Sequence, residues 1–89
     1  RLGGEEIVVV VPDTPLDGAR IVAERIRERI EGEPFLVHRG TRRVNVTVSI
    51  GVAARQAGDQ TSADVLKRAD EAVYRAKELG RNRVVSEAA

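Results

Sequence analysis

Residues 44–53 alternate between two kinds of side chain, and this alternation constrains the fold more than any other feature of the chain. Every second residue is a branched aliphatic one, and the residues between them are small or polar. The aliphatic set is Val44, Val46, Val48, Ile50 and Val52, and the intervening set is Asn45, Thr47, Ser49, Gly51 and Ala53. Because successive side chains of a strand point to opposite faces, the pattern predicts a β-strand with one apolar face.

Three further segments have the character of strands. Residues 7–11 are an uninterrupted run of Ile and Val, which is typical of a strand covered on both faces. Residues 35–38 are separated from the alternating segment by a turn at 39–42, so we expect a hairpin between 35–38 and 44–53. Residues 84–85 predict a brief last strand.

Two amphipathic helices are predicted between these strands. In residues 16–31 the apolar residues recur at helical spacing, namely Ala19, Val22, Ala23, Ile26 and Ile30. The second helix begins at an N-cap, Thr61, followed three residues later by Asp64, and it ends at Gly80. The order β-α-β-β-α-β indicates an α/β fold, an α+β sandwich of two helices on a sheet that contains an antiparallel hairpin.

Composition excludes several classes of protein. The 89 residues form one domain, and 15 basic against 14 acidic side chains argue against a nucleic-acid-binding arm. The absence of cysteine excludes disulfides and thiolate zinc sites. No apolar stretch approaches the ~20 residues of a membrane-spanning helix, so we expect no membrane contact by this segment. We expect a soluble, cytoplasmic protein, whose last residues, 87–89, are frayed.

The first candidate site is Gly3-Gly4-Glu5-Glu6, directly before the Ile7–Val11 run. Glycines let a ligand approach the backbone closely, and two adjacent carboxylates could hold a hard cation such as Mg²⁺. The alternative is an ordinary hairpin turn with exposed glutamates, since Gly-Gly is a common turn dipeptide.

A second candidate lies at the end of the second helix, where Lys77 and Arg81 are four residues apart and could contact one polyanion. The alternative is that the helix dipole favours cations at this end. By spacing alone Arg25 belongs to a solvated helix face. His38 has no neighbouring Cys or His, so a metal role is not expected, and we expect Tyr74 to be packed.

Short segments in a fixed order give the sequence a family resemblance. They are RLGGEEI at 1–7, AERIR at 23–27, VTVSIGV at 46–52, ADEAVYRAK at 69–77 and GRN at 80–82. Together they resemble the GGDEF family, the diguanylate cyclase domains of bacterial signalling proteins, and most of all the C-terminal end of PleD-type response regulators. The resemblance implies that residues 1–89 are the C-terminal half of a GGDEF domain with a nucleotide-cyclase-like, ferredoxin-like core.

The family implies a reaction and its partners. Such domains condense two GTP into cyclic di-GMP and release pyrophosphate at the interface of a homodimer, with Mg²⁺ or Mn²⁺ as cofactor. By position, Glu5 and Glu6 match the catalytic, metal-binding carboxylates of the signature. Gly3 and Gly4 match the glycines that let the nucleotide lie close to the backbone. Ile7 stands where the family usually has Phe, and we expect little effect on the chemistry.

The remaining matches concern phosphate contacts. Lys77 and Arg81 match residues that contact the triphosphate, and Arg25 matches a residue with which some members bind inhibitory cyclic di-GMP.

The resemblance also implies that part of the domain is absent. The first half of a GGDEF domain carries another metal-binding aspartate, the residues that read guanine, and the central strand of the sheet. We therefore expect the chain alone to be inactive, and we expect 7–11 and 44–53 to flank the missing strand with open edges that promote self-association. Two alternatives stay open: a degenerate binding or dimerisation module that senses GTP or cyclic di-GMP, and an unrelated α/β protein whose GGEE is a simple turn.

Overall fold

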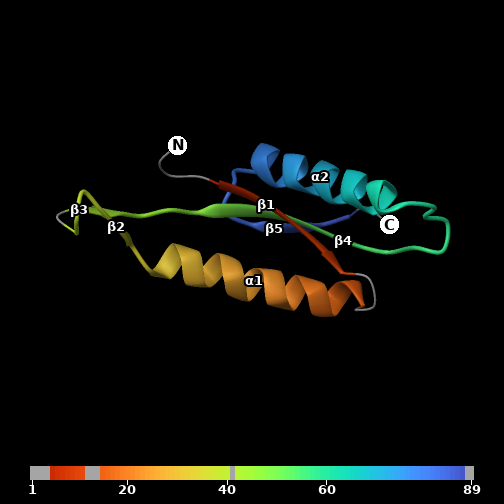
Figure 1. The fold of residues 1–89 in the computed structure, drawn as a ribbon, viewed down its shortest axis with the longest axis horizontal. Coiled ribbons are helices and arrows are strands. Elements are labelled where there is room, and N and C mark those ends of the chain that lie inside the picture. Colours follow the sequence, from red (N-terminus) through yellow and green to blue (C-terminus); the bar gives the residue numbers. More distant parts are fainter. Residues whose placement is uncertain (1–4, 12–14, 41, 88–89) are drawn as a thin grey trace.

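The structure, a computed structural model, describes residues 5–11, 15–40 and 42–87 and arranges most of them in three layers, with one helix on each side of a sheet (Figure 1). The elements are β1 (Glu5–Val11), α1 (Leu16–Gly32), β2 (Phe35–Val37), β3 (Arg42–Val44), β4 (Val48–Ala54), α2 (Ser62–Glu78) and β5 (Val84–Ser86). The mixed α/β fold and both helices predicted from the sequence are confirmed.

The main sheet has the order β1-β4-β5, and β4 lies between the two others, parallel to both. Its register with β1 runs from Glu5 opposite Val48 to Val11 opposite Ala54. The expectation that these two strands would leave open edges facing a missing strand is wrong, because they pair directly with each other. The pairing satisfies backbone groups of β4, a strand buried under both helices, that would otherwise lack hydrogen bonds.

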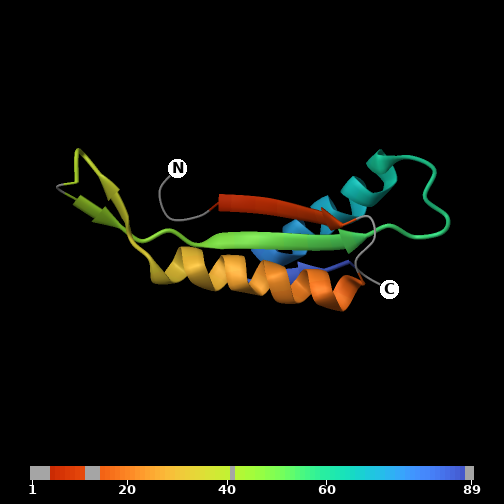
Figure 2. The same ribbon diagram turned by 60° about the horizontal axis from the view of Figure 1, so that its bottom comes forward.

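The alternating segment is divided between two sheets. Residues 42–44 form β3, which pairs antiparallel with β2 in a hairpin that extends away from the layers, and residues 48–54 form β4 (Figure 2). A hairpin with 35–37 forms as predicted, but its second strand is 42–44, so the predicted turn at 39–42 is wrong at Arg42, and the single strand over 44–53 is also wrong. The chain changes pairing partner across 45–47, since β4 must pair with β1 and β5 while β3 pairs with β2 alone.

The two faces of β4 pack against different helices. Val48, Ile50 and Val52 are fully buried in one cluster with Ala19 and Ala23 of α1. The small residues of the alternation face α2, where a Cβ at Gly51 would overlap the Ala69 carbonyl oxygen. The small face therefore lets α2 approach the strand closely, and the apolar face receives α1.

Both ends of α2 form as the sequence predicts. An Asp64 carboxylate oxygen accepts hydrogen bonds from the Thr61 amide, at 3.1 Å, and from the Gln60 amide, at 2.8 Å. At the other end Gly80 takes a left-handed φ of 119°, and the Arg81 amide donates back to the Ala76 carbonyl at 2.9 Å. This is the Schellman arrangement that ends helices at glycine.

The chain after β5 is ordered by Arg68 of α2, and the prediction of a frayed tail is wrong at Glu87. The Glu87 amide donates to the Val52 carbonyl at 2.8 Å, and its carboxylate accepts from Arg68 Nε at 3.1 Å. The same guanidinium donates to both Asp59 oxygens, at 2.6 and 2.8 Å. These hydrogen bonds tie the 55–60 loop and the tail to α2. Residues 88 and 89 lie outside the described part of the chain.

Candidate functional site

The first element of the candidate site is an ion pair between β1 and α2. Lys77 Nζ lies 3.0 Å from Glu6 Oε2, and the two side chains are 29% and 49% exposed. Glu6 shares its side of β1 with Val8, which packs on the α2-facing cluster. Lys77 stands in the last turn of α2. The packing of α2 on the sheet therefore brings together two residues that are 71 positions apart in the sequence.

A hollow of about 440 Å³ surrounds this pair. It is lined by Glu6, Val8, Asp70, Val73, Tyr74 and Lys77. Asp70, Tyr74 and Lys77 follow one another at spacings of four and three residues, so they share one face of α2. Asp70 is not among the site residues predicted from the sequence, although its spacing from Tyr74 and Lys77 indicates the shared face. An anion in the hollow would meet the ammonium group of Lys77. A cation would meet the carboxylates of Glu6 and Asp70, of which Glu6 is already paired with Lys77.

Glu5 belongs to the other side of β1. Its amide donates to the Thr47 carbonyl at 3.0 Å, and by strand alternation its side chain shares the side of Ile7 and Val9, which pack on the α1-facing cluster. Both glutamates are exposed at the start of the strand. Glu5 and Glu6 therefore leave the backbone on opposite faces.

A divalent cation finds only part of its ligand shell in these residues. No group of three or more Asp, Glu, His or Cys side chains suited to a metal occurs within the described ranges. Magnesium is commonly held by one or two carboxylates and completes its shell with water and substrate phosphates. Exposed carboxylates at the start of β1 fit such a role, in which other ligands come from outside the described residues.

Arg81 lies just beyond the end of α2, on the same helix terminus as Lys77. It is half-buried and takes a left-handed φ of 65°, which is uncommon for a residue with a side chain. The structure thus places both predicted phosphate contacts at one helix end. Gly3 and Gly4, the other predicted nucleotide contacts, lie outside the described residues.

Arg25 lies apart from this cluster. It is exposed on α1, which covers the face of the sheet opposite α2 (Figure 1). The structure therefore does not bring Arg25 to the Glu6–Lys77 pair, and any ligand that it binds would occupy a separate position.

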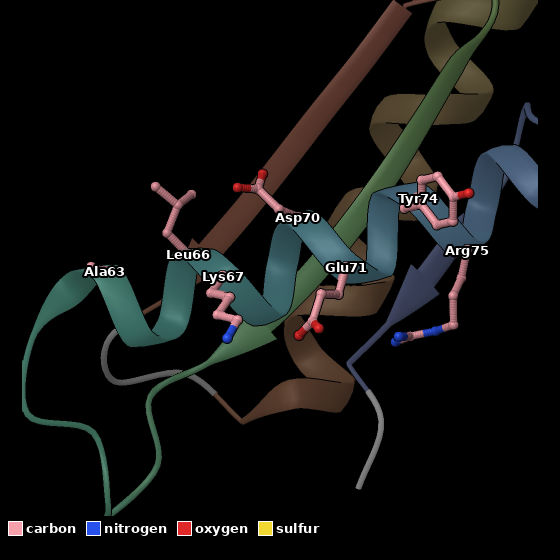
Figure 3. Close-up of a pocket in the computed structure, with 7 residues that line it drawn as sticks. All are labelled: Ala63, Leu66, Lys67, Asp70, Glu71, Tyr74 and Arg75. Carbon is pink, nitrogen blue, oxygen red and sulfur yellow. The ribbon is translucent and has the colours of Figure 1, made fainter.

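A second and more open hollow, of about 540 Å³, runs along the outer surface of α2. Leu66, Asp70 and Tyr74 project from one side of the helix, and Lys67, Glu71 and Arg75 from the other (Figure 3). Tyr74 is 62% exposed, so the prediction that it packs is wrong. It lines both hollows, since it stands on the ridge of α2 between them.

Neither described helix is both long and apolar enough to cross a bilayer.

Comparison with known proteins identifies relatives over almost the whole chain. The family described as "Diguanylate cyclase, GGDEF domain" matches residues 1–83. The chain is 54% identical over 89 residues to the response regulator PleD of Caulobacter vibrioides and 42% identical over 84 residues to diguanylate cyclase A of Treponema denticola. It is also 42% identical over 84 residues to diguanylate cyclase DgcP of Pseudomonas aeruginosa.

These matches cover 100%, 94% and 94% of the chain but only 20%, 22% and 12% of PleD, diguanylate cyclase A and DgcP, respectively. The chain thus spans about a fifth or less of the length of these curated relatives.

Proposed function

The chain belongs to the GGDEF family of diguanylate cyclase domains, and from this premise we propose that the protein carrying it condenses two GTP into cyclic di-GMP and pyrophosphate. The observation that carries the proposal is the Glu6–Lys77 pair, which sets a signature carboxylate beside a cation at the end of α2. In this proposal residues 1–89 are the C-terminal half of the domain, and the reaction takes place in the cytoplasm between two facing copies.

The reaction consists of two nucleotidyl transfers, one from each GTP. The 3′-hydroxyl oxygen of each GTP attacks the α-phosphorus of the other, pyrophosphate leaves, and the hydroxyl proton passes to a base, for which Glu5 is the candidate. Lys77 and Arg81 would contact the triphosphate and stabilise negative charge that develops on the leaving group. Gly3 and Gly4 would let the nucleotide lie against the backbone.

Glu5 and Glu6 would hold Mg²⁺ or Mn²⁺, which when bound neutralises phosphate charge and orients the triphosphate. Both exposed carboxylates offer the oxygen ligands that such ions prefer, but because they leave β1 on opposite faces, a single ion would have to lie at the start of the strand to reach both. The Glu6–Lys77 pair would open to admit the nucleotide, since both side chains keep substantial exposure.

Arg25 is proposed as part of an inhibitory site for the product. Its position on α1, across the sheet from Lys77, supports a site at which cyclic di-GMP binds without competing for the substrate position. Replacing Arg25 with Ala should weaken inhibition by added cyclic di-GMP and leave the uninhibited rate unchanged, whereas unaltered inhibition would remove this assignment.

The isolated 89-residue chain is proposed to be inactive, because the described residues supply only part of a metal shell and the family resemblance places the guanine-reading residues in the first half of a GGDEF domain. Incubation of the chain with GTP and Mg²⁺, followed by mass spectrometry, should show no cyclic di-GMP. Turnover by the isolated chain would overturn this part of the proposal.

The full-length protein gives the main test. Replacing Glu5 with Gln should abolish cyclic di-GMP synthesis and preserve the fold, since Glu5 is exposed. Unchanged synthesis would reject the site assignment. The alternative of a degenerate module that only binds GTP or cyclic di-GMP predicts nucleotide binding without turnover in the wild-type protein.

A further inference from the structure

The turn between α2 and β5 has an unusual backbone. Three consecutive residues take positive φ values, namely Gly80 at 119°, Arg81 at 65° and Asn82 at 45°. Glycine adopts this conformation freely and asparagine tolerates it, but a residue such as arginine rarely does. Residues held in this region cluster at functional sites and persist only where their surroundings hold them.

The Asn82 side chain is held between two residues of α1. Arg27 Nη1 donates to Asn82 Oδ1 at 3.0 Å, and Asn82 Nδ2 donates to Glu31 Oε2 at 2.6 Å. The ring closes because Arg27 Nη1 also donates to Glu31 Oε1 at 3.2 Å. We call Arg27, Glu31 and Asn82 the α1 clasp.

Arg27 is itself fixed within α1. Its side chain is only 16% exposed, and its Nε donates to Glu24. Burial by itself would lower the pKa of Arg27, but hydrogen bonds and negative charge from Glu24 and Glu31 outweigh burial and raise it. The guanidinium is therefore a permanent, oriented donor to the turn.

The backbone on either side of Asn82 is also anchored. The Arg81 amide donates to Ala76 at 2.9 Å, Arg83 Nε donates to the Arg81 carbonyl at 3.1 Å, and the Arg83 carbonyl accepts from the Ile50 amide at 2.9 Å. These bonds fix the ends of the turn to α2 and to the sheet. The α1 clasp adds side-chain contacts at Asn82, the residue next to Arg81.

We infer that Asn82, Arg27 and Glu31 are positioning residues that hold Arg81 in its left-handed conformation, so that its guanidinium meets the substrate triphosphate next to Lys77. This role rests on the proposed function. It extends the substrate site by three residues, and two of them, Arg27 and Glu31, belong to α1 on the face of the sheet opposite α2. None of the three needs to touch the nucleotide.

Asn82→Asp in the full-length protein is the critical variant. Aspartate is almost isosteric and tolerates positive φ, but it places a second carboxylate where the Asn82 amide donates to Glu31. The α1 clasp should open, and the Kd for GTPαS with Mg²⁺, measured by calorimetry, should rise about tenfold. Adding Glu31→Gln should restore binding, because the new amide can donate to the introduced carboxylate. Asn82→Gly, which permits the backbone and removes the α1 clasp, should resemble Asn82→Asp.

A double-mutant cycle with Arg81→Ala separates positioning from general stability. If Asn82 acts through Arg81, then Asn82→Asp adds nothing to the Kd once Arg81 is removed. Arg29→Ala is the matched control, since Arg29 pairs with Glu33 on the same helix at 3.0 Å in an exposed position. It should leave the Kd unchanged.

The outcomes distinguish the inference from the proposed function. Wild-type binding by Asn82→Asp, or an additive effect in the Arg81→Ala background, overturns the inference. If Arg81→Ala impairs synthesis while Asn82→Asp does not, the proposed function stands without the α1 clasp. If Arg81→Ala changes neither nucleotide binding nor synthesis, both the inference and the assignment of Arg81 are overturned.

Discussion

The Lys77 ammonium lies 3.0 Å from Glu6 Oε2 and joins the last turn of α2 to the start of β1. Each partner remains partly exposed, so the pair resembles a surface ion pair, which contributes about 0–1 kcal/mol to stability. The Glu6–Lys77 pair therefore contributes little to the stability of the fold. Its position beside a hollow that a phosphate group could enter suggests that its main role is functional.

Substitution at Lys77 should separate activity from stability. We expect Lys77→Ala in the full-length protein to lower cyclic di-GMP synthesis about a hundredfold, the effect of removing one preorganised donor to developing charge. The free energy of unfolding should change by less than about 1 kcal/mol. Lys67→Ala is the control, because Lys67 does not line the hollow around Lys77 and projects from the side of α2 opposite Asp70, which does (Figure 3). Equal losses of activity in the two variants would contradict the assignment.

Gly51→Ala should destabilise the fold strongly. The added Cβ would overlap the Ala69 carbonyl oxygen and lie 2.5 Å from the Val73 amide nitrogen, both of which are backbone atoms of α2. Moving α2 away from β4 would cost about 1–3 kcal/mol or more. Urea denaturation checks this result. Gly58→Ala is the control, since a Cβ there meets nothing within 4 Å, and a similar loss in both variants would argue against close packing as the cause.

We expect the interaction of Asp59 with Arg68 to stabilise the fold at neutral pH and to lose this effect in acid. Hydrogen bonds from the Arg68 guanidinium, helped by the Gln56 amide, lower the pKa of Asp59 to about 2. Because the folded pKa lies below the unfolded value of about 3.9, this stabilisation is complete above the unfolded pKa and is lost as the pH falls from about 4 to 2.

Thermal denaturation across this range checks the prediction. Asp59→Asn should lower the Tm at neutral pH and reduce the difference in Tm between pH 5 and pH 2. Glu33→Gln, which alters a carboxylate in an exposed ion pair, should leave that difference nearly unchanged. An unaltered pH dependence in Asp59→Asn would show that the Arg68 network does not stabilise the fold through Asp59.

The sequence predicts the elements of this fold better than their pairing. Helical periodicity, the Thr61–Asp64 capping box and Gly80 are local signals, and both helices form within two residues of the predicted ends. The alternation at 44–53 is also local, but it records only that side chains face two environments. It does not show that the chain changes partner at 45–47, because strand partners are chosen by long-range packing.

For the candidate site, too, the sequence identifies individual residues but not their long-range contacts. Glu6 and Lys77 are recognisable by family resemblance, and the structure adds that they touch. The contacts of Arg27 and Glu31 with Asn82 join residues more than 50 positions apart, and Arg27 and Glu31 by themselves resemble an ordinary i,i+4 pair on a helix surface. No periodicity or spacing could show that the pair also binds a turn.

We expect the edge of β1 that faces away from β4 to mediate contacts between chains. The Glu5 amide bonds to Thr47 of the loop before β4, so the backbone groups of Glu6, Val8 and Val10 point away from β4. Within the described residues this edge has no paired strand, and exposed, uncharged edges promote pairing between chains. An antiparallel pairing centred on Val8 would set Glu6 opposite Val10 of a second copy, without placing two glutamates face to face.

We therefore expect the isolated 89-residue chain to self-associate through β1, although not through the β4 edge, which is closed. Sedimentation velocity should show an average mass that rises with concentration. Val10→Lys should suppress this association, because Val10 is 40% exposed and a lysine on an edge strand opposes pairing. Ile21→Lys, at a 56% exposed position of α1, adds the same charge away from the edge and should leave association intact. A monomer at all concentrations, or equal suppression by both variants, would show that the β1 edge is not the contact.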